Sequence, residues 1–270
     1  MSKKRKHAQR KGQVITPRQV ERWLDQAFDR VARADYEGAV HTCQRLMRYT
    51  SPQTPQRARA LESLGLAHAM LQQFDDAYAA LSEAVSINPD DADLWYNRGL
   101  SSRFTMRFGQ AVKDFERAAA LEKDEQMAAR YAEELSVSRE MAERERALRG
   151  PDLTLEQLIE QEEYYHQAVE LMRTQQWSLA EQAFRQVIQM GDSLPQPWGN
   201  LGGCLIMQQR YDEAEAALKR ALGIDPNYRH ARDNLALLPE TRQLGHPPTM
   251  QITHPFEGHQ LKKSIVFRKA

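Results

Sequence analysis

Cysteine and long apolar runs are both scarce in this sequence of 270 residues. The two cysteines, Cys43 and Cys204, fall on different expected helices, so we expect no disulfide framework and a reducing compartment. No apolar run approaches the roughly 20 residues that span a bilayer. The basic N-terminus also lacks the apolar segment of a secretory signal. We therefore expect a cytoplasmic protein without a membrane span.

The residue patterns of common catalytic and metal sites are missing as well. There is no Gly-rich phosphate loop, no pair of nucleophile and base, and no cluster of metal ligands. His246, His254 and His259 do not have a zinc-site spacing supported by cysteine. Lys+Arg and Asp+Glu are both 37, so net charge favours no charged partner. We expect neither an enzyme nor a cofactor.

A period of 34 residues dominates the sequence. Small residues recur with spacings of 12 and 7, first in Ala58–Asp91 and then one, three and four periods later, with a shift of one residue before the last two. The four sets are Gly65, Ala77 and Ala84; Gly99, Ala111 and Ala118; Ala168, Ala180 and Val187; and Gly202, Ala214 and Ala221. Small side chains let two helices approach closely, and a fixed period of this size indicates a repeat architecture.

The remaining positions of each unit support this interpretation. Phe74 and Phe108 follow the expected turn between helices, and Asn88-Pro89 ends the second helix of its unit. These units resemble tetratricopeptide repeats over about 20–125 and 161–240. Arg98 and Lys123 depart from the family pattern, which usually has leucine and proline there. The resemblance implies an all-α fold, an α-solenoid of about five helix–turn–helix units plus a capping helix.

The regularity fails after Glu125, where acids take the small-residue positions Glu133, Glu145 and Asp152. Burial of acids is costly, so we expect a long helix that caps the first array, with a solvated far end and a stop at Gly150. Two arrays joined by this helix are favoured over one continuous superhelix. The expected organisation is a basic disordered arm at 1–16, a first array of three units at 17–125, a degenerate helix at 126–151, a second array of two units and a capping helix at 152–240, and a tail at 241–270 that has the alternation of a β-hairpin.

In the family, the first helix of each unit lines the inner face of the superhelix. Transferred residue by residue, this face is Leu24, Phe28, Leu66, Met70, Tyr96, Leu100, Arg103, Phe104, Tyr165, Met172 and Arg173. So apolar a face predicts binding of a peptide or an amphipathic helix, unless neighbouring helices or the tail cover it. Asn97 and Asn200 match the asparagine of the carboxylate clamp of some relatives. The clamp's lysine position holds Glu62 and Tyr165, so we do not expect a clamp.

The N-terminal arm carries six positive charges and no acid: Lys3, Lys4, Arg5, Lys6, Arg10 and Lys11. Such a block suits RNA, an anionic membrane or an acidic protein, and it also resembles a nuclear address. No aromatic residue is interleaved for base stacking, and a solvated tail is the simpler interpretation. The leading hypothesis is thus a non-enzymatic scaffold for protein partners. The alternatives are an RNA- or ribosome-associated adaptor and a scaffold that self-assembles into oligomers.

Overall fold

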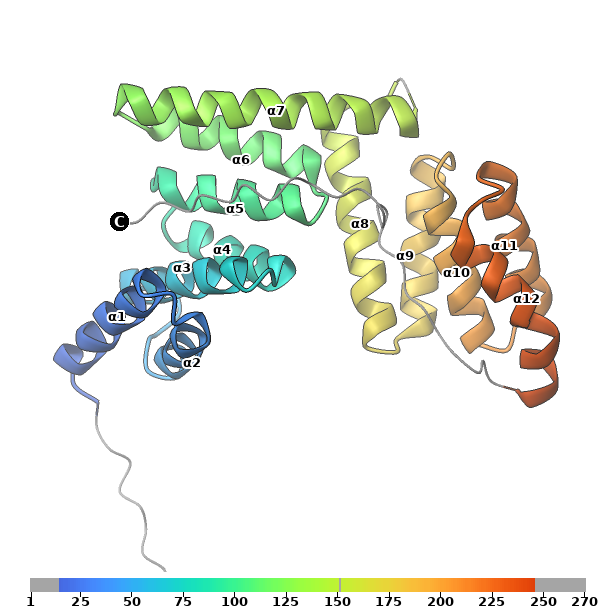
Figure 1. Ribbon diagram of the computed structural model, residues 1–270, viewed down its shortest axis with the longest axis horizontal. Helices are drawn as coiled ribbons and strands as arrows, with labels where there is room; N and C mark the ends of the chain where they lie inside the picture. Colours follow the sequence, from blue (N-terminus) through green and yellow to red (C-terminus); the bar gives the residue numbers. More distant parts are fainter. Residues whose placement is uncertain (1–14, 151, 246–270) are drawn as a thin grey trace, which may run out of the picture. The chain divides into compact units, whose positions relative to one another are not determined.

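The computed structural model describes residues 15–150 and 152–245, and all regular elements in these ranges are α-helices (Figure 1). The predicted all-α, helical-repeat class is therefore confirmed. The basic residues of the arm and the predicted hairpin at 246–270 lie outside the described residues. The last helix runs to Leu244, slightly past the expected end of the second array.

The chain forms two compact units, which divide between Leu94 and Trp95. The described parts are 15–94, here the first unit, and 95–245, here the second unit. The predicted arrays at 17–125 and 152–240 remain a prediction, because these units follow a different boundary.

Four helices build the first unit: α1 (Pro17–Ala32), α2 (Tyr36–Met47), α3 (Pro55–Met70) and α4 (Phe74–Ile87). Consecutive helices pack on each other, and α1 also packs on α3. α1 starts with a capping box, in which the Thr16 hydroxyl and the Gln19 side chain each accept a backbone N–H of the other. α5 (Ala92–Phe104) begins just before the boundary and continues into the second unit.

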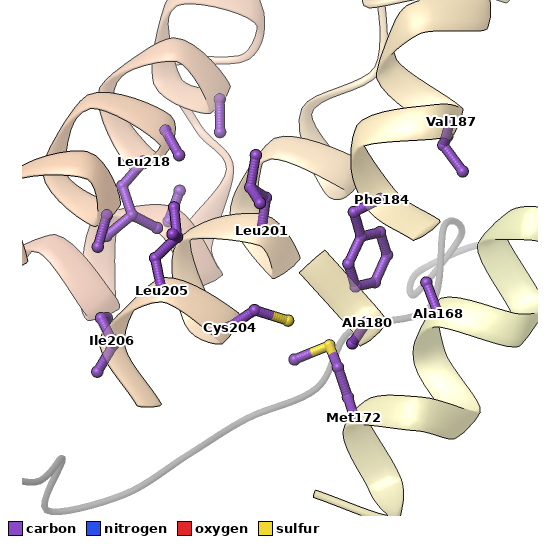
Figure 2. Close-up of a cluster of buried hydrophobic side chains, with 14 of the residues drawn as sticks. Ala168, Met172, Ala180, Phe184, Val187, Leu201, Cys204, Leu205, Ile206 and Leu218 are labelled. Atoms are coloured by element: carbon purple, nitrogen blue, oxygen red, sulfur yellow. The ribbon is translucent and has the colours of Figure 1, made fainter. Parts of the chain in front are cut away.

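The other helices belong to the second unit. They are α6 (Phe108–Leu121), α7 (Glu125–Arg149), α8 (Leu155–Arg173), α9 (Trp177–Met190), α10 (Pro195–Met207), α11 (Tyr211–Ile224) and α12 (Arg229–Leu244). Figure 2 shows the core that α8 to α11 share, where Phe184 and Met172 face Cys204 and Leu201. Thr154 and Gln157 form a capping box at the start of α8.

The small-residue positions lie where helices touch. A Cβ atom added to Gly65 would lie 2.5 Å from Leu81 Cγ, and one added to Gly202 would lie 2.7 Å from Leu218 Cγ. Real Cβ atoms do not approach other atoms so closely, so each glycine sets the distance between the two helices of its repeat.

The expectation of a solvated far end for α7 is wrong. Its N-terminal half buries Tyr131, but Ala142, Glu145 and Arg149 near its C-terminus are buried as well. α6 contacts both α7 and α8. An acid at Glu145 is tolerated because Arg149, one turn later, forms an ion pair with it at 3.2 Å.

Candidate binding surface

The structure divides the eleven predicted inner-face residues into a buried and an accessible group. The buried ones, each at most 6% exposed, are Leu24, Leu66, Tyr96, Leu100, Tyr165 and Met172. Phe28, Arg103 and Phe104 are half-buried, and Met70 and Arg173 are exposed. Most of the predicted face is therefore covered by the chain itself, which is the alternative that the sequence left open. Whether the accessible residues bind a partner remains a prediction.

Helix α7 covers the inner face of α5. The ring of Tyr96 stacks on Tyr131 with centroids 4.6 Å apart and meets Phe115 edge-on at 5.7 Å. The Arg103 guanidinium forms an ion pair with Glu134 at 2.6 Å. Two predicted anchors, Tyr96 and Arg103, thus have partners inside the second unit.

The corresponding face of α8 and α10 is also filled. Asn200 Nδ2 donates to the Tyr165 hydroxyl oxygen at 2.9 Å, and both residues are buried. A Cβ atom on Gly199 would lie 2.6 Å from the ring of Tyr228, which precedes α12. The asparagine that matches the clamp pattern is therefore bonded to a tyrosine of its own chain.

The inner face of α1 and α3 in the first unit stays partly open. Leu24 and Leu66 are buried beneath it, whereas Met70 is 36% exposed and Phe28 is half-buried. The Arg59 guanidinium lies 5.9 Å from the centre of the Phe28 ring, within cation–π range. The accessible apolar surface of this face is therefore concentrated at Phe28 and Met70.

Glu62, which replaces the clamp lysine in this unit, has an unfavourable charge environment for an anionic ligand. Its burial, followed by the nearby Asp91 and Asp93, raises the pKa of the Glu62 carboxyl to about 7. An acidic group at this position would repel a peptide carboxylate rather than bind it.

Arg98, the departure from the family's leucine, is explained by Asp114 on the facing helix. Asp114 is fully buried and accepts hydrogen bonds from Arg98, Ser102 and Gln110. Burial raises the pKa of the Asp114 carboxyl, and Arg98 opposes this shift. The sequence held the signal for this pair, because a charge on each of two packed helices calls for a partner, but we did not predict it.

A second feature missed from the sequence is the junction of α6 with α8. Glu162 is fully buried and accepts the first backbone N–H groups of α6, from Phe108 at 3.0 Å and Gly109 at 3.1 Å. Burial raises the pKa of Glu162 to about 8, against the effect of Arg149 and of these two N–H groups. Gly109 permits the close approach, because a Cβ atom there would lie 2.7 Å from Ile159 Cγ1.

A buried polar network continues from this junction to α9. Arg149 donates to Glu145 and, through Nη1, to the Gln161 side-chain oxygen at 3.0 Å. The Gln161 amide donates in turn to the Val187 carbonyl at 3.1 Å, and the Ser193 hydroxyl donates to the Arg149 carbonyl at 2.8 Å. The polar side chains that are buried where the repeat is interrupted are therefore hydrogen-bonded to one another or to the backbone.

Metal sites and membrane-spanning helices are both absent from the described residues. Within 15–150 and 152–245, no group of three or more His, Cys, Asp or Glu side chains is placed to hold a metal ion. No helix in the same ranges has both the length and the apolar character needed to cross a membrane.

Comparison with known proteins identifies the repeats. Family models described as tetratricopeptide repeat match residues 58–101 and 165–229. No curated protein matches the chain significantly.

Solved structures of repeat proteins resemble parts of the chain at low identity. The translocator chaperone SycD of Yersinia enterocolitica type III secretion is 16% identical, with 48% of this chain and 89% of SycD covered and a TM-score of 0.43. The TPR2AB domain of yeast Sti1, in a complex with pHSP90, is 15% identical, with 85% of each chain covered and a TM-score of 0.37. YrrB, a TPR protein with an unusual peptide-binding site, is 14% identical, with 80% and 91% covered and a TM-score of 0.34. TM-scores this low carry no ligand or mechanism over to this chain.

Proposed function

Because two segments of this chain match tetratricopeptide-repeat models, we propose that it is a non-enzymatic interaction scaffold that binds a partner protein on the α1–α3 face of the first unit. The ligand is a peptide or an amphipathic helix with apolar side chains. The observation that carries this proposal is the 36% exposure of Met70 on α3, together with the half-buried Phe28 on α1, which packs on α3. The equivalent face of the second unit is filled by Tyr131, Tyr228 and other side chains of the chain itself.

The α1–α3 face combines apolar side chains with a bordering arginine, as binding hot spots do. Leu24 and Leu66 form a rigid apolar floor, and Met is a flexible side chain that adapts to different ligands. Arg59, which pairs with Glu21 at 2.8 Å, borders the face and supplies polar contacts at its rim. Burial of a few anchors of this kind supplies most of the affinity in a typical interface.

A displayed library of random peptides, selected on the full chain, tests the proposal. Selected peptides should contain closely spaced apolar residues, and their affinity should fall about tenfold or more for Met70→Asp, because a charge would be buried against the ligand. Phe28→Ala should weaken them by more than about 1 kcal/mol if Phe28 is an anchor. Tyr49→Ala, which removes an exposed aromatic ring from the turn after α2, is the matched control and should leave the affinity unchanged.

The same selection also contains the result that would refute the proposal. Peptides that bind equally well to the parent chain and to both variants would place the binding surface elsewhere. Phe104→Ala then examines the remaining half-buried inner-face residue of the second unit. Tyr96→Ala is less informative for binding, because Tyr96 is buried under Tyr131 and its loss acts on stability first.

We also propose a cytoplasmic location, on the basis of the cysteines. Cys43 and Cys204 are free thiols and fully buried, and burial raises the pKa of each to about 12. Such thiols neither form a disulfide nor react readily, as expected for a protein of a reducing compartment. Oligomerisation through the tail stays a prediction, since the tail lies outside the described residues.

A further inference from the structure

Carboxylates flank the accessible apolar side chains of the α1–α3 face on both helices. On α1, Asp25 and Glu21 lie one turn and two turns before Phe28, on the same side of the helix. On α3, Glu62 lies two turns before Met70, again on one side of the helix. A ligand that covers Phe28 and Met70 therefore comes close to acids at both helices.

Arginine offsets only part of this negative charge. The Arg59 guanidinium forms ion pairs with Glu21 at 2.8 Å and with Asp25 at 3.5 Å, yet the Asp25 side chain remains 73% exposed. Arg18, one turn before Glu21, is exposed as well. Exposed ion pairs of this kind are weak, so these carboxylates can also bind a cation that a ligand brings.

Two further acids adjoin Glu62 within the first unit. Burial, followed by the charges of Asp91 and Asp93, raises the pKa of the Glu62 carboxyl, and Arg59 lowers it. Asp91 also fixes the start of α5, because its side chain accepts the backbone N–H groups of Asp93 and Leu94. The acidic rim, as we call this set, consists of Glu21, Asp25, Glu62, Asp91 and Asp93, and its acids outnumber the two arginines beside them, Arg18 and Arg59.

We propose that the ligand of the α1–α3 face is a cationic amphipathic segment, in which lysine or arginine flanks the apolar residues. This inference rests on the proposed function, because it specifies the charge of the same ligand. The apolar residues cover Phe28 and Met70, and the cations reach the acidic rim. Opposite charges at the edge of an interface speed association and select among partners.

The same charges disfavour the other occupants of the face. Nucleic acid and anionic lipid would bring phosphates against the acidic rim, and an acidic peptide would bring carboxylates. A second copy of the chain, paired through this face about a two-fold axis, would place one acidic rim against another. Like charges set against each other in an interface weaken binding.

Three synthetic amphipathic peptides, titrated into the full chain, test the charge of the ligand separately from its apolar character. Each has about 18 residues, enough for a helix, and the same leucine face, whereas the polar face carries lysine, glutamine or glutamate. Fluorescence anisotropy is measured at pH 8, above the pKa of about 7 of Glu62. In about 0.1 M salt the lysine peptide should bind at least about tenfold more tightly than the glutamate peptide. In about 1 M salt this ratio should fall below about threefold, because the Debye length shrinks from about 10 Å to about 3 Å.

A variant of the acidic rim tests whether the preference arises at this face. Asp25→Asn with Glu62→Gln removes two charges and keeps the shapes of the side chains, so the lysine peptide should bind about threefold or more weakly, whereas the glutamine peptide should change by less than about twofold. Glu37→Gln with Asp76→Asn removes the same charge from exposed positions of α2 and α4 and should leave all three affinities unchanged. Circular-dichroism melting of each variant confirms the fold.

The outcomes separate this inference from the proposed function. Equal affinities of the three peptides, or tighter binding of the glutamate peptide, would overturn the cationic ligand, although Phe28→Ala would still weaken every peptide if the proposed face is correct. A preference for lysine that the rim variant does not reduce would also overturn the inference. If Phe28→Ala changes none of the affinities, the proposed face itself is wrong. A dimer in sedimentation velocity that Phe28→Ala dissociates would assign the face to a second copy of the chain instead.

Discussion

Replacement of Glu162 by glutamine should change how the stability of the protein depends on pH. The Glu162 carboxyl is fully buried at the N-terminus of α6, and its pKa is raised from 4.5 to about 8. An acid with a higher pKa in the folded than in the unfolded protein takes up a proton on folding between these values. Its contribution to stability is complete below pH 4.5 and is lost as the pH rises through 8.

The size of the effect follows from the width of this window. Each pH unit between the two pKa values is worth about 1.4 kcal/mol, so the full contribution is at most about 5 kcal/mol. Glutamine cannot ionise, but its amide group faces one of the two backbone N–H groups that Glu162 accepts. One buried donor without an acceptor costs about 1–3 kcal/mol at any pH.

The free energies of unfolding of the parent chain and of Glu162→Gln are compared by urea titration at pH 5, 7 and 9. The parent chain should be more stable than Glu162→Gln at pH 5, and the difference should shrink or reverse by pH 9. Glu163→Gln is the matched control, since this neighbouring carboxylate is exposed and its loss should change stability by less than about 0.5 kcal/mol. A difference that stays the same from pH 5 to pH 9 would refute the reasoning. It would mean that Glu162 is already ionised at pH 5, held by Arg149 and the two N–H groups.

Four further substitutions probe the same unit, each by the free energy of unfolding. Gly109→Ala should destabilise the chain by about 1–3 kcal/mol because the new methyl group collides with α8, whereas Gly223→Ala, where a Cβ atom meets open space, should stabilise it by about 0.5–1 kcal/mol. Arg149→Met should cost about 3–5 kcal/mol because it leaves Glu145 buried without its cation; a loss below 1 kcal/mol would mean that the network is not structural. Gln175→Gly should stabilise by up to about 1 kcal/mol, because the residue has a φ of 59° in the turn after α8, and a loss would contradict this.

The repeated part of the fold was predictable from the sequence because its contacts are local and recur. The spacing of Gly65, Ala77 and Ala84 identifies two helices that touch, and the same spacing reappears wherever the same contact is made. The capping boxes at Thr16 and Thr154 were equally predictable, since they involve residues three positions apart. A periodic pattern predicts the contacts that every repeat unit shares. It does not predict contacts that only one unit makes.

The candidate site was less predictable, because the exposure of a side chain depends on contacts that occur in one place of the structure and do not repeat in every unit. The sequence assigned Tyr96 to the first helix of its repeat unit. It could not show that Tyr131 of α7 stacks on the Tyr96 ring. Tyr131 belongs to the stretch where the repeat fails, so no spacing relates the two residues. Met70 and Tyr96 were both predicted to lie on the inner face, and only the packing of later helices makes one accessible and the other buried.

The acids in the segment after Glu125, where the repeat fails, made that segment look solvated, although much of it is packed. Charged residues at small-residue positions indicate that the regular helix pair is absent, but they do not indicate that the segment is solvated. Glu145 is buried with Arg149, and Glu162 is buried against the N-terminus of α6, so the irregular junction replaces apolar contacts by polar ones with specific partners. Polar junctions have one satisfactory geometry, whereas apolar stripes tolerate several. It follows that substitutions at Glu162 and Arg149 should alter the α6–α8 packing more than equally large changes within a regular repeat.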